Sequence, residues 1–211
     1  MILKETIELY QPLKQYISGL ISGFDSLSEE RKILLKTMAS CIKTELINAG
    51  KADLVFICTH NSRRSHLAQI WAQTAAYYCG IEGIKCYSGG TEVTAFNPRA
   101  VKAIEKTGFK IGKSGNEENP HYRVSFSDNH SLLVYSKKFD APENPSIGFC
   151  AILTCSDADE KCPFIPGANR ISLTYDDPKQ FDGGPLEEIK YDERCREIAG
   201  ELFYGFSLLK P

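Results

Sequence analysis

Two stretches within residues 1–50 carry hydrophobic positions at helical spacing. Apolar residues recur at intervals of mostly three or four: Ile7, Leu9, Leu13, Ile17, Leu20 and Ile21 in the first stretch, and Ile33, Leu34, Met38, Ile42, Leu46 and Ile47 in the second. Ser26 and Glu29 match a capping box before the second stretch, and Gly50 suits the position after its end. The pattern predicts an N-terminal helical extension that packs on the rest of the chain or joins two copies in a homodimer.

After residue 50, short apolar runs alternate with longer amphipathic stretches. The runs predict buried strands over residues 53–58, 84–88, 149–155 and 170–175. Helical spacing returns over residues 65–79, after Asn97-Pro98 and over residues 186–209, and Asn97 is a suitable N-cap. Strands that alternate with helices indicate parallel βαβ units. We therefore expect an α/β domain over residues 51–211, in which four parallel strands are flanked by helices.

One segment departs from this alternation. Residues 121–127 and 130–137 are rich in β-branched and aromatic side chains, and Asp128-Asn129 between them suits a two-residue turn. The segment predicts a β-hairpin before the strand at 149–155. It contains no nucleophile and no metal-ligand cluster, which favours a structural or oligomeric role, although its length would let it reach over the ends of the parallel strands.

The charge balance excludes several classes of function. The 211 residues include 25 basic and 27 acidic side chains, for a formal net charge of −2. This balance argues against nucleic acid and against a membrane as partners, and no uncharged run is long enough to cross a bilayer. The N-terminus shows no secretory signal. We therefore expect a cytoplasmic protein whose eight cysteines are reduced thiols, some of them catalytic.

The strongest chemical signal is the sequence CTHNSRRS at residues 58–65, between a predicted strand and a predicted helix. In the pattern C-x5-R-S, backbone N–H groups and the helix N-terminus form a cradle for a tetrahedral oxyanion. The same field stabilises a thiolate at Cys58, the expected nucleophile; Arg64 binds two anion oxygens, and Ser65 hydrogen-bonds the thiolate. Side-chain hydrogen bonds from Asn61 to the backbone stabilise the loop. The predicted oxyanion-binding residues are Thr59, His60, Asn61, Ser62, Arg63, Arg64 and Ser65.

The segment VFICTHNSRRSHLAQ resembles the phosphate loop of the low-molecular-weight protein tyrosine phosphatases and of the thioredoxin-coupled arsenate reductases that share their fold. The likeness covers residues 53–209, but it leaves out residues 1–50, an extension, and about 112–146, an insertion that contains the hairpin. It implies a phosphotyrosine phosphatase I-like sheet with the strand order 2-1-3-4 and a catalytic domain over residues 51–211.

Cys155 and Cys162 follow the third predicted strand at C-x6-C spacing, in the sequence LTCSDADEKCP. The spacing is wider than in a CxxC zinc knuckle, no second pair completes four ligands, and the glycine and glutamate of an EF-hand are missing. No metal site and no cofactor are therefore predicted. The segment resembles the redox segment of the arsenate reductases, in which two cysteines relay a disulfide outward, and it favours that branch of the family.

The sequence YDDP at residues 175–178 follows the fourth predicted strand. Family members carry Asp-Pro in this loop, and the resemblance implies that Asp177 protonates the leaving oxygen while Asp176 is structural. In the phosphatases a tyrosine that contacts the substrate ring follows the proline. Lys179 and Gln180 follow it here, which argues against an aryl phosphate substrate.

The loop region departs from the family at three further positions. His60 stands where glycine is common, and histidine tolerates a positive φ better than most residues. Arg63 replaces a frequent cysteine and is expected to add positive charge near the anion. Some reductases hold potassium partly through a glutamate early in the next helix, and Gln69 stands at that position.

We interpret the chain as an arsenate reductase. Cys58 attacks arsenate, Asp177 protonates the departing oxygen, and a disulfide passes from Cys58–Cys155 to Cys155–Cys162, where a thioredoxin-like dithiol reduces it. Two alternatives stay open: a phosphatase that hydrolyses phosphomonoesters through a phosphocysteine at Cys58, and an oxyanion or redox sensor without catalysis. The remaining cysteines are expected to be unpaired, as buried apolar or incidental residues: Cys41, Cys79, Cys86, Cys150 and Cys195.

Overall fold

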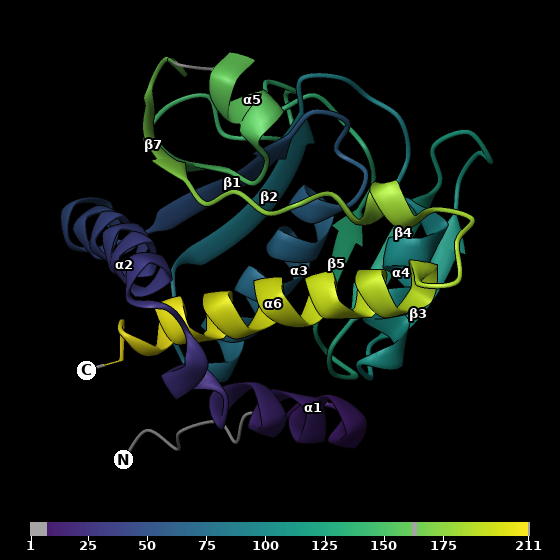
Figure 1. The fold of residues 1–211 in the computed structure, drawn as a ribbon. Helices are drawn as coiled ribbons and strands as arrows, with labels where there is room; N and C mark the ends of the chain where they lie inside the picture. Colours follow the sequence, from purple (N-terminus) through teal and green to yellow (C-terminus); the bar gives the residue numbers. More distant parts are fainter. Residues whose placement is uncertain (1–7, 162–163, 211) are drawn as a thin grey trace.

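The computed structural model describes residues 8–161 and 164–210 (Figure 1). Among these residues, four parallel strands form the central sheet in the order β2-β1-β6-β7, which is the predicted order 2-1-3-4. Their bounds are β1 (Ala52–Cys58), β2 (Ile84–Gly90), β6 (Phe149–Leu153) and β7 (Ala168–Ser172). The two central strands, β1 and β6, are buried at every position because both faces of the sheet are covered.

Side chains of β1 alternate between two apolar layers. Leu54 and Phe56 pack into the larger core with the helices α2 (Glu29–Ala49), α3 (Arg64–Tyr78) and α6 (Glu187–Ser207). Val55 and Ile57 face the opposite layer, which includes the short helix α5 (Ser156–Lys161). Figure 1 shows α5 on one side of the strands and α6 crossing on the other. The helix α4 (Pro98–Lys106) begins after Asn97, whose side chain accepts a hydrogen bond from the Arg99 N–H, as predicted.

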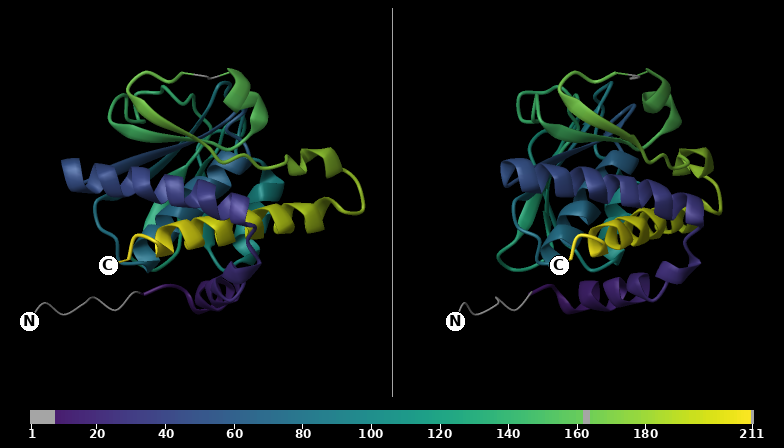
Figure 2. Two further views of the ribbon diagram at one scale, coloured as in Figure 1. Left: turned by 60° about the vertical axis from the view of Figure 1, so that its left-hand side comes forward. Right: turned by 90° about the vertical axis from the view of Figure 1, so that its left-hand side faces the viewer.

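The N-terminal helices pack against α6. After α1 (Gln11–Ile21), a 3-10 turn η1 (Phe24–Ser26) leads into α2, which lies beside α6 (Figure 2). The Arg31 guanidinium of α2 binds the buried Glu201 carboxylate of α6 through two nitrogens, at 2.5 and 2.7 Å. No helix in the described ranges is long and apolar enough to span a membrane.

The predicted capping box before α2 is wrong. Ser28, not Ser26, is the N-cap, and its side chain accepts a hydrogen bond from the Arg31 N–H at 3.2 Å. The Ser26 hydroxyl instead donates to the Gly23 carbonyl inside the 3-10 turn, so it is not available to the helix. The predicted end at Gly50 is confirmed, since Gly50 has a φ of 69° and donates its N–H to the Leu46 carbonyl.

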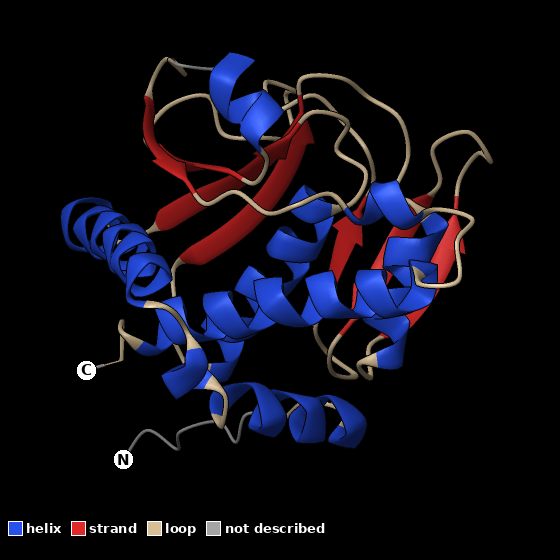
Figure 3. Ribbon diagram, viewed as in Figure 1, coloured by secondary structure: helices blue, strands red, loops and turns tan. Residues whose placement is uncertain are grey.

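The predicted hairpin is confirmed, and it belongs to a separate antiparallel sheet. In the described residues this sheet has the order β3-β4-β5, with β3 (Lys110–Ser114), β4 (His121–Ser125) and β5 (Ser131–Val134). Figure 3 shows it beside the parallel sheet, behind one end of α6. The sequence did not reveal β3, because its KIGKS segment is largely exposed and lacks an apolar alternation.

Cys41 of α2 and Cys150 of β6 form a disulfide. The expectation that both are unpaired thiols is therefore wrong. The two residues are 109 positions apart, and no local pattern relates them before α2 is placed on the sheet. The bond connects the N-terminal helices covalently to a strand in the middle of the sheet. Cys58, Cys79, Cys86, Cys155 and Cys195 are free thiols among the described residues.

Removal of this disulfide is expected to lower the stability of the fold. In the chain-entropy account, a bond that closes a loop of this length restricts the unfolded chain strongly, and Cys41→Ala with Cys150→Ala should lower the free energy of unfolding by about 2–5 kcal/mol. Guanidinium unfolding of the oxidised proteins measures the change. Dithiothreitol should lower the wild-type midpoint toward that of the double variant. Equal midpoints for the oxidised wild type and the double variant would contradict the prediction.

Candidate active site

The phosphate loop connects the end of β1 to the start of α3. The sulfur of Cys58 lies 3.1 Å from the Ser65 hydroxyl oxygen, which also accepts a hydrogen bond from the Asn61 side-chain amide at 2.9 Å. Because the Ser65 oxygen accepts from Asn61, its own hydrogen is free to point at the sulfur. Ser65 thus presents a donor to a thiolate at Cys58.

Asn61 gives the loop its turn. It has a φ of 43°, in the left-handed region, whereas His60 was expected to need this conformation. His60 instead directs a partly exposed ring toward Glu92, 3.5 Å away. An asparagine tolerates the left-handed region, so the loop is compatible with histidine at the preceding position.

Segments far away in the sequence hold the loop from outside. The Asn61 side-chain oxygen accepts the backbone N–H of Lys137 at 2.8 Å, and the His60 carbonyl accepts hydrogen bonds from the Thr94 and Ser136 hydroxyls. Ser62 donates to the Ala95 carbonyl at 2.7 Å. The chain just after β5 therefore contacts the loop. Sequence reasoning missed these contacts because no motif marks them.

Arg64 is held between the loop and the segment after β7. It donates to the Tyr175 carbonyl at 2.9 Å and to the Asp177 carboxylate at 2.7 Å. The other Asp177 oxygen accepts the Lys179 N–H, which caps the 3-10 turn η2 (Pro178–Phe181). Asp176 points outward to Arg194, at 3.5 Å. The structure therefore directs Asp177, rather than Asp176, at the loop.

The Arg63 side chain binds groups outside the phosphate loop. Its guanidinium donates to the Tyr191 hydroxyl at 2.7 Å and lies 3.5 Å from Asp182. Tyr191 in turn donates to Asp182 at 2.8 Å, and burial raises the pKa of this tyrosine to about 12, so it remains a neutral donor. The predicted extra positive charge near the anion is thus neutralised by the segment that leads into α6. No motif in the sequence marks Tyr191 or Asp182 as part of the site.

Cys155 lies beside the loop, in the same buried cluster as Cys58. Its sulfur is 3.6 Å from the hydroxyl of Thr59, the residue after the nucleophile, and it accepts the Ala158 N–H at 3.4 Å. Cys155 is 1% exposed. Cys162, the second cysteine of the predicted pair, lies outside the described residues.

The residues near Gln69 do not fit the potassium ion held by some reductases. Gln69 is a neutral amide whose nitrogen donates to the Cys86 carbonyl. The ammonium-bearing side chain of Lys137 lines the same pocket, and its charge repels a second cation. No group of His, Cys, Asp and Glu side chains in residues 8–161 and 164–210 is arranged to hold a metal ion.

Comparison with known proteins agrees with this geometry. The family described as low molecular weight phosphotyrosine protein phosphatase matches residues 53–120, which include the phosphate loop. An arsenate reductase from Bacillus subtilis is 30% identical over 155 residues, which cover 73% of this chain and 94% of the relative. This chain belongs to the low-molecular-weight phosphatase and arsenate reductase family.

A second relative and a solved structure extend the comparison. An arsenate reductase from Bacillus licheniformis is 30% identical over 159 residues, covering 75% of this chain and 96% of the relative. The crystal structure of a YwlE mutant from Bacillus subtilis matches with a TM-score of 0.50 and 15% identity, over 76% of this chain and 100% of that chain. The predicted α/β fold is confirmed, and the protein is an enzyme of this family.

Proposed function

We propose that this enzyme reduces arsenate to arsenite. The observation that carries the proposal is the place of Cys155, buried beside the phosphate loop with its sulfur 3.6 Å from the Thr59 hydroxyl. A phosphatase of this mechanism needs no second thiol there. The arsenate reductases from the two Bacillus species support the same choice.

The first step forms a bond between sulfur and arsenic. The loop N–H groups and Arg64 bind the arsenate oxygens, and the Cys58 thiolate attacks arsenic. One oxygen leaves as water after it receives a proton from the Asp177 carboxyl group, which the anion has displaced from its contact with Arg64. Ser65 holds the Cys58 sulfur during the attack.

The second step reduces arsenic. The Cys155 thiolate attacks the Cys58 sulfur, the sulfur–arsenic bond breaks, and its electron pair stays on arsenic, which leaves as arsenite. Two thiols have lost two electrons, and arsenic has gained them. Cys162 then attacks Cys155 and releases Cys58 as a thiolate. A thioredoxin-like dithiol reduces the Cys155–Cys162 disulfide, and the presence of such a reductant is the ground for placing the enzyme in the cytoplasm.

The family match also supports hydrolysis of phosphomonoesters as a second candidate function. That reaction needs Cys58, Arg64 and Asp177 but no other cysteine. Lys179 and Gln180 come directly after Pro178, so no aromatic ring stands at the position after the proline. Paired assays separate the candidates: oxidation of NADPH through thioredoxin and its reductase with arsenate, beside hydrolysis of p-nitrophenyl phosphate. Turnover in neither assay would leave the oxyanion or redox sensor as the explanation.

Cys162→Ser is expected to stop cycling after one turnover. The first two steps do not use Cys162, so arsenate should leave a Cys58–Cys155 disulfide that cannot pass outward. Mass spectrometry of peptides from the arsenate-treated variant detects this bond. Cys79→Ser, a free thiol at the end of α3, is the matched control and should cycle normally. Repeated turnovers of Cys162→Ser with thioredoxin would show that the proposed order of exchanges is wrong.

A further inference from the structure

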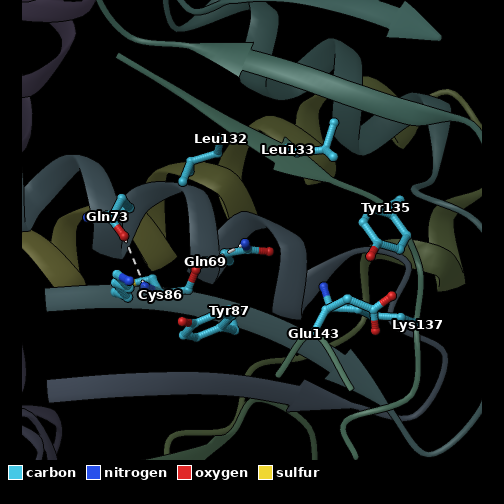
Figure 4. A pocket seen from close by; sticks show the side chains of 10 residues that line it. Gln69, Gln73, Cys86, Tyr87, Leu132, Leu133, Tyr135, Lys137 and Glu143 are labelled. Atoms are coloured by element: carbon cyan, nitrogen blue, oxygen red, sulfur yellow. Dashed lines mark hydrogen bonds between the residues drawn. The ribbon is translucent and has the colours of Figure 1, made fainter. Parts of the chain in front are cut away.

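A pocket of about 280 Å³ lies between α3, β2 and the chain that follows β5 (Figure 4). Both charged and apolar side chains line it. Its lining includes Gln69, Tyr135, Lys137 and Glu143, and β2 and β5 supply much of the remainder. The pocket is a separate feature from the phosphate loop, but Lys137 belongs to both, because its backbone N–H binds Asn61 of the loop.

Lys137 carries its charge into a buried position. The residue is 8% exposed, and its nitrogen lies 4.8 Å from the centre of the Tyr135 ring, a cation-π distance. Burial lowers the pKa of Lys137 to about 8, against the attraction of the Glu143 carboxylate, which raises it. At pH 7 the amine is therefore mostly protonated. A buried ammonium destabilises a fold unless other interactions compensate, so its presence calls for a function.

Gln69 faces the same space with an unsatisfied oxygen. The residue is 4% exposed, and its side-chain oxygen has no hydrogen-bond partner among the described residues. In Figure 4 this oxygen lies on the side of Gln69 that faces Tyr135 and Lys137. A buried, unpaired carbonyl oxygen favours a positive charge nearby, and the Lys137 side chain lines the same pocket, beyond hydrogen-bond distance of this oxygen.

We propose that Lys137 is the resident cation of this pocket, so that its ammonium takes over the role of a monovalent metal ion and strengthens oxyanion binding by the phosphate loop. The backbone of Lys137 is anchored at the loop: its N–H binds the Asn61 side chain, and its carbonyl accepts the Gly90 N–H at 2.9 Å, while its side chain extends into the pocket. A low-dielectric position makes one positive charge felt strongly at the anion. The inference rests on the proposed oxyanion binding, but not on the choice between arsenate and phosphate esters.

The other groups around Lys137 do not change their charge in the same pH range. His66 of α3 is buried, and burial together with the Lys137 charge lowers its pKa to about 3, so it stays neutral. Burial raises the pKa of Tyr135 and of Tyr87 on β2, so both phenols stay protonated. Glu143 supplies the facing carboxylate, and Lys85 is an exposed ammonium at the rim.

Removal of the Lys137 charge should have opposite effects on stability and on binding. The pKa of Lys137 in the folded protein lies below the ordinary 10.5, so its amine binds the proton more tightly in the unfolded chain than in the folded one. The buried charge therefore destabilises the fold below about pH 8, and this cost fades as the pH rises from about 8 to about 10.5. A lysine with a purely structural role would stabilise the fold instead.

Lys137→Met, which leaves an unbranched side chain one atom shorter and without the charge, tests the proposal at pH 7. We expect the melting temperature to rise by about 3 °C or more and the affinity for sulfate, a dianion across this pH range, to fall about tenfold. The difference in sulfate affinity from wild type should disappear above about pH 8. Lys85→Met removes a rim charge and should leave both quantities near wild type. A lower melting temperature, a failure to fold or an unchanged sulfate affinity for Lys137→Met would overturn the proposal.

The wild-type protein gives an independent test. At constant ionic strength, its melting temperature and sulfate affinity should be the same in potassium, sodium and choline chloride. A melting temperature or a sulfate affinity that is higher in potassium chloride than in the other two salts would show that the pocket takes a metal ion and that Lys137 is not its resident cation. Neither measurement needs turnover, so a failed arsenate assay would not be mistaken for a failure of this inference.

Discussion

Cys58→Ser is expected to abolish arsenate reduction and ester hydrolysis alike. The reaction needs a thiolate that the loop N–H groups and Ser65 stabilise. A serine hydroxyl at this position has no general base to remove its proton, because the side chain that contacts residue 58 is the Ser65 hydroxyl. The NADPH-coupled arsenate assay and the p-nitrophenyl phosphate assay measure the loss.

Two controls make this result specific to the site. Sulfate binding to Cys58→Ser shows that the loop is still formed, since the N–H groups and Arg64 are unchanged. Cys79→Ser removes a free thiol elsewhere and should keep full activity. Robust turnover by Cys58→Ser in either assay would mean that the nucleophile has been assigned to the wrong residue.

Asp177→Asn is expected to slow the first chemical step by about 10²–10⁴-fold, the usual contribution of a positioned general acid. The amide keeps the shape of the side chain but has no acidic proton to give to the leaving oxygen. Anion binding should be spared, because Arg64 retains its bond to the Tyr175 carbonyl and loses a competing carboxylate. Single-turnover release of arsenite measures the step.

Asp176→Asn is the matched control for this experiment. The two aspartates are neighbours, but Asp176 is exposed and faces Arg194, while Asp177 binds Arg64. Only a small effect is expected from Asp176→Asn. If the neighbouring substitution were instead the damaging one, the proton donor would be Asp176, and the assignment across the Asp-Asp-Pro turn would be displaced by one residue.

Elements with strong periodicity could be predicted from the sequence. The apolar runs that became β1 and β6 are buried on both faces, so their composition alone indicates central parallel strands. The exposed strand β3 has no such signal, because it is recruited to its sheet by pairing with β4. The capping box failed for a local reason: a 3-10 turn used Ser26 before α2 could.

The residues of the site also fall into a group that the sequence predicts and a group that it does not. Cys58, Asn61 and Ser65 act within a few residues of one another, so a linear motif contains them. Arg63 meets Tyr191 of α6, Cys41 meets Cys150, and Lys137 meets the loop only after the chain has folded. Contacts between distant segments depend on how helices and sheet pack, and a single sequence carries no local trace of them.

The ion pair between Arg64 and Asp177 engages the arginine that the proposed mechanism uses to bind the oxyanion. An incoming oxyanion must displace a carboxylate that already satisfies the arginine, so a weakly binding monoanion such as chloride gains little by entering. A dianion with several oxygens also accepts hydrogen bonds from the loop N–H groups, and this additional binding lets it replace the Asp177 carboxylate on Arg64. The displaced carboxylate then lies beside the bound anion, so binding of the substrate would release from its ion pair the side chain that the first step of the proposed mechanism uses.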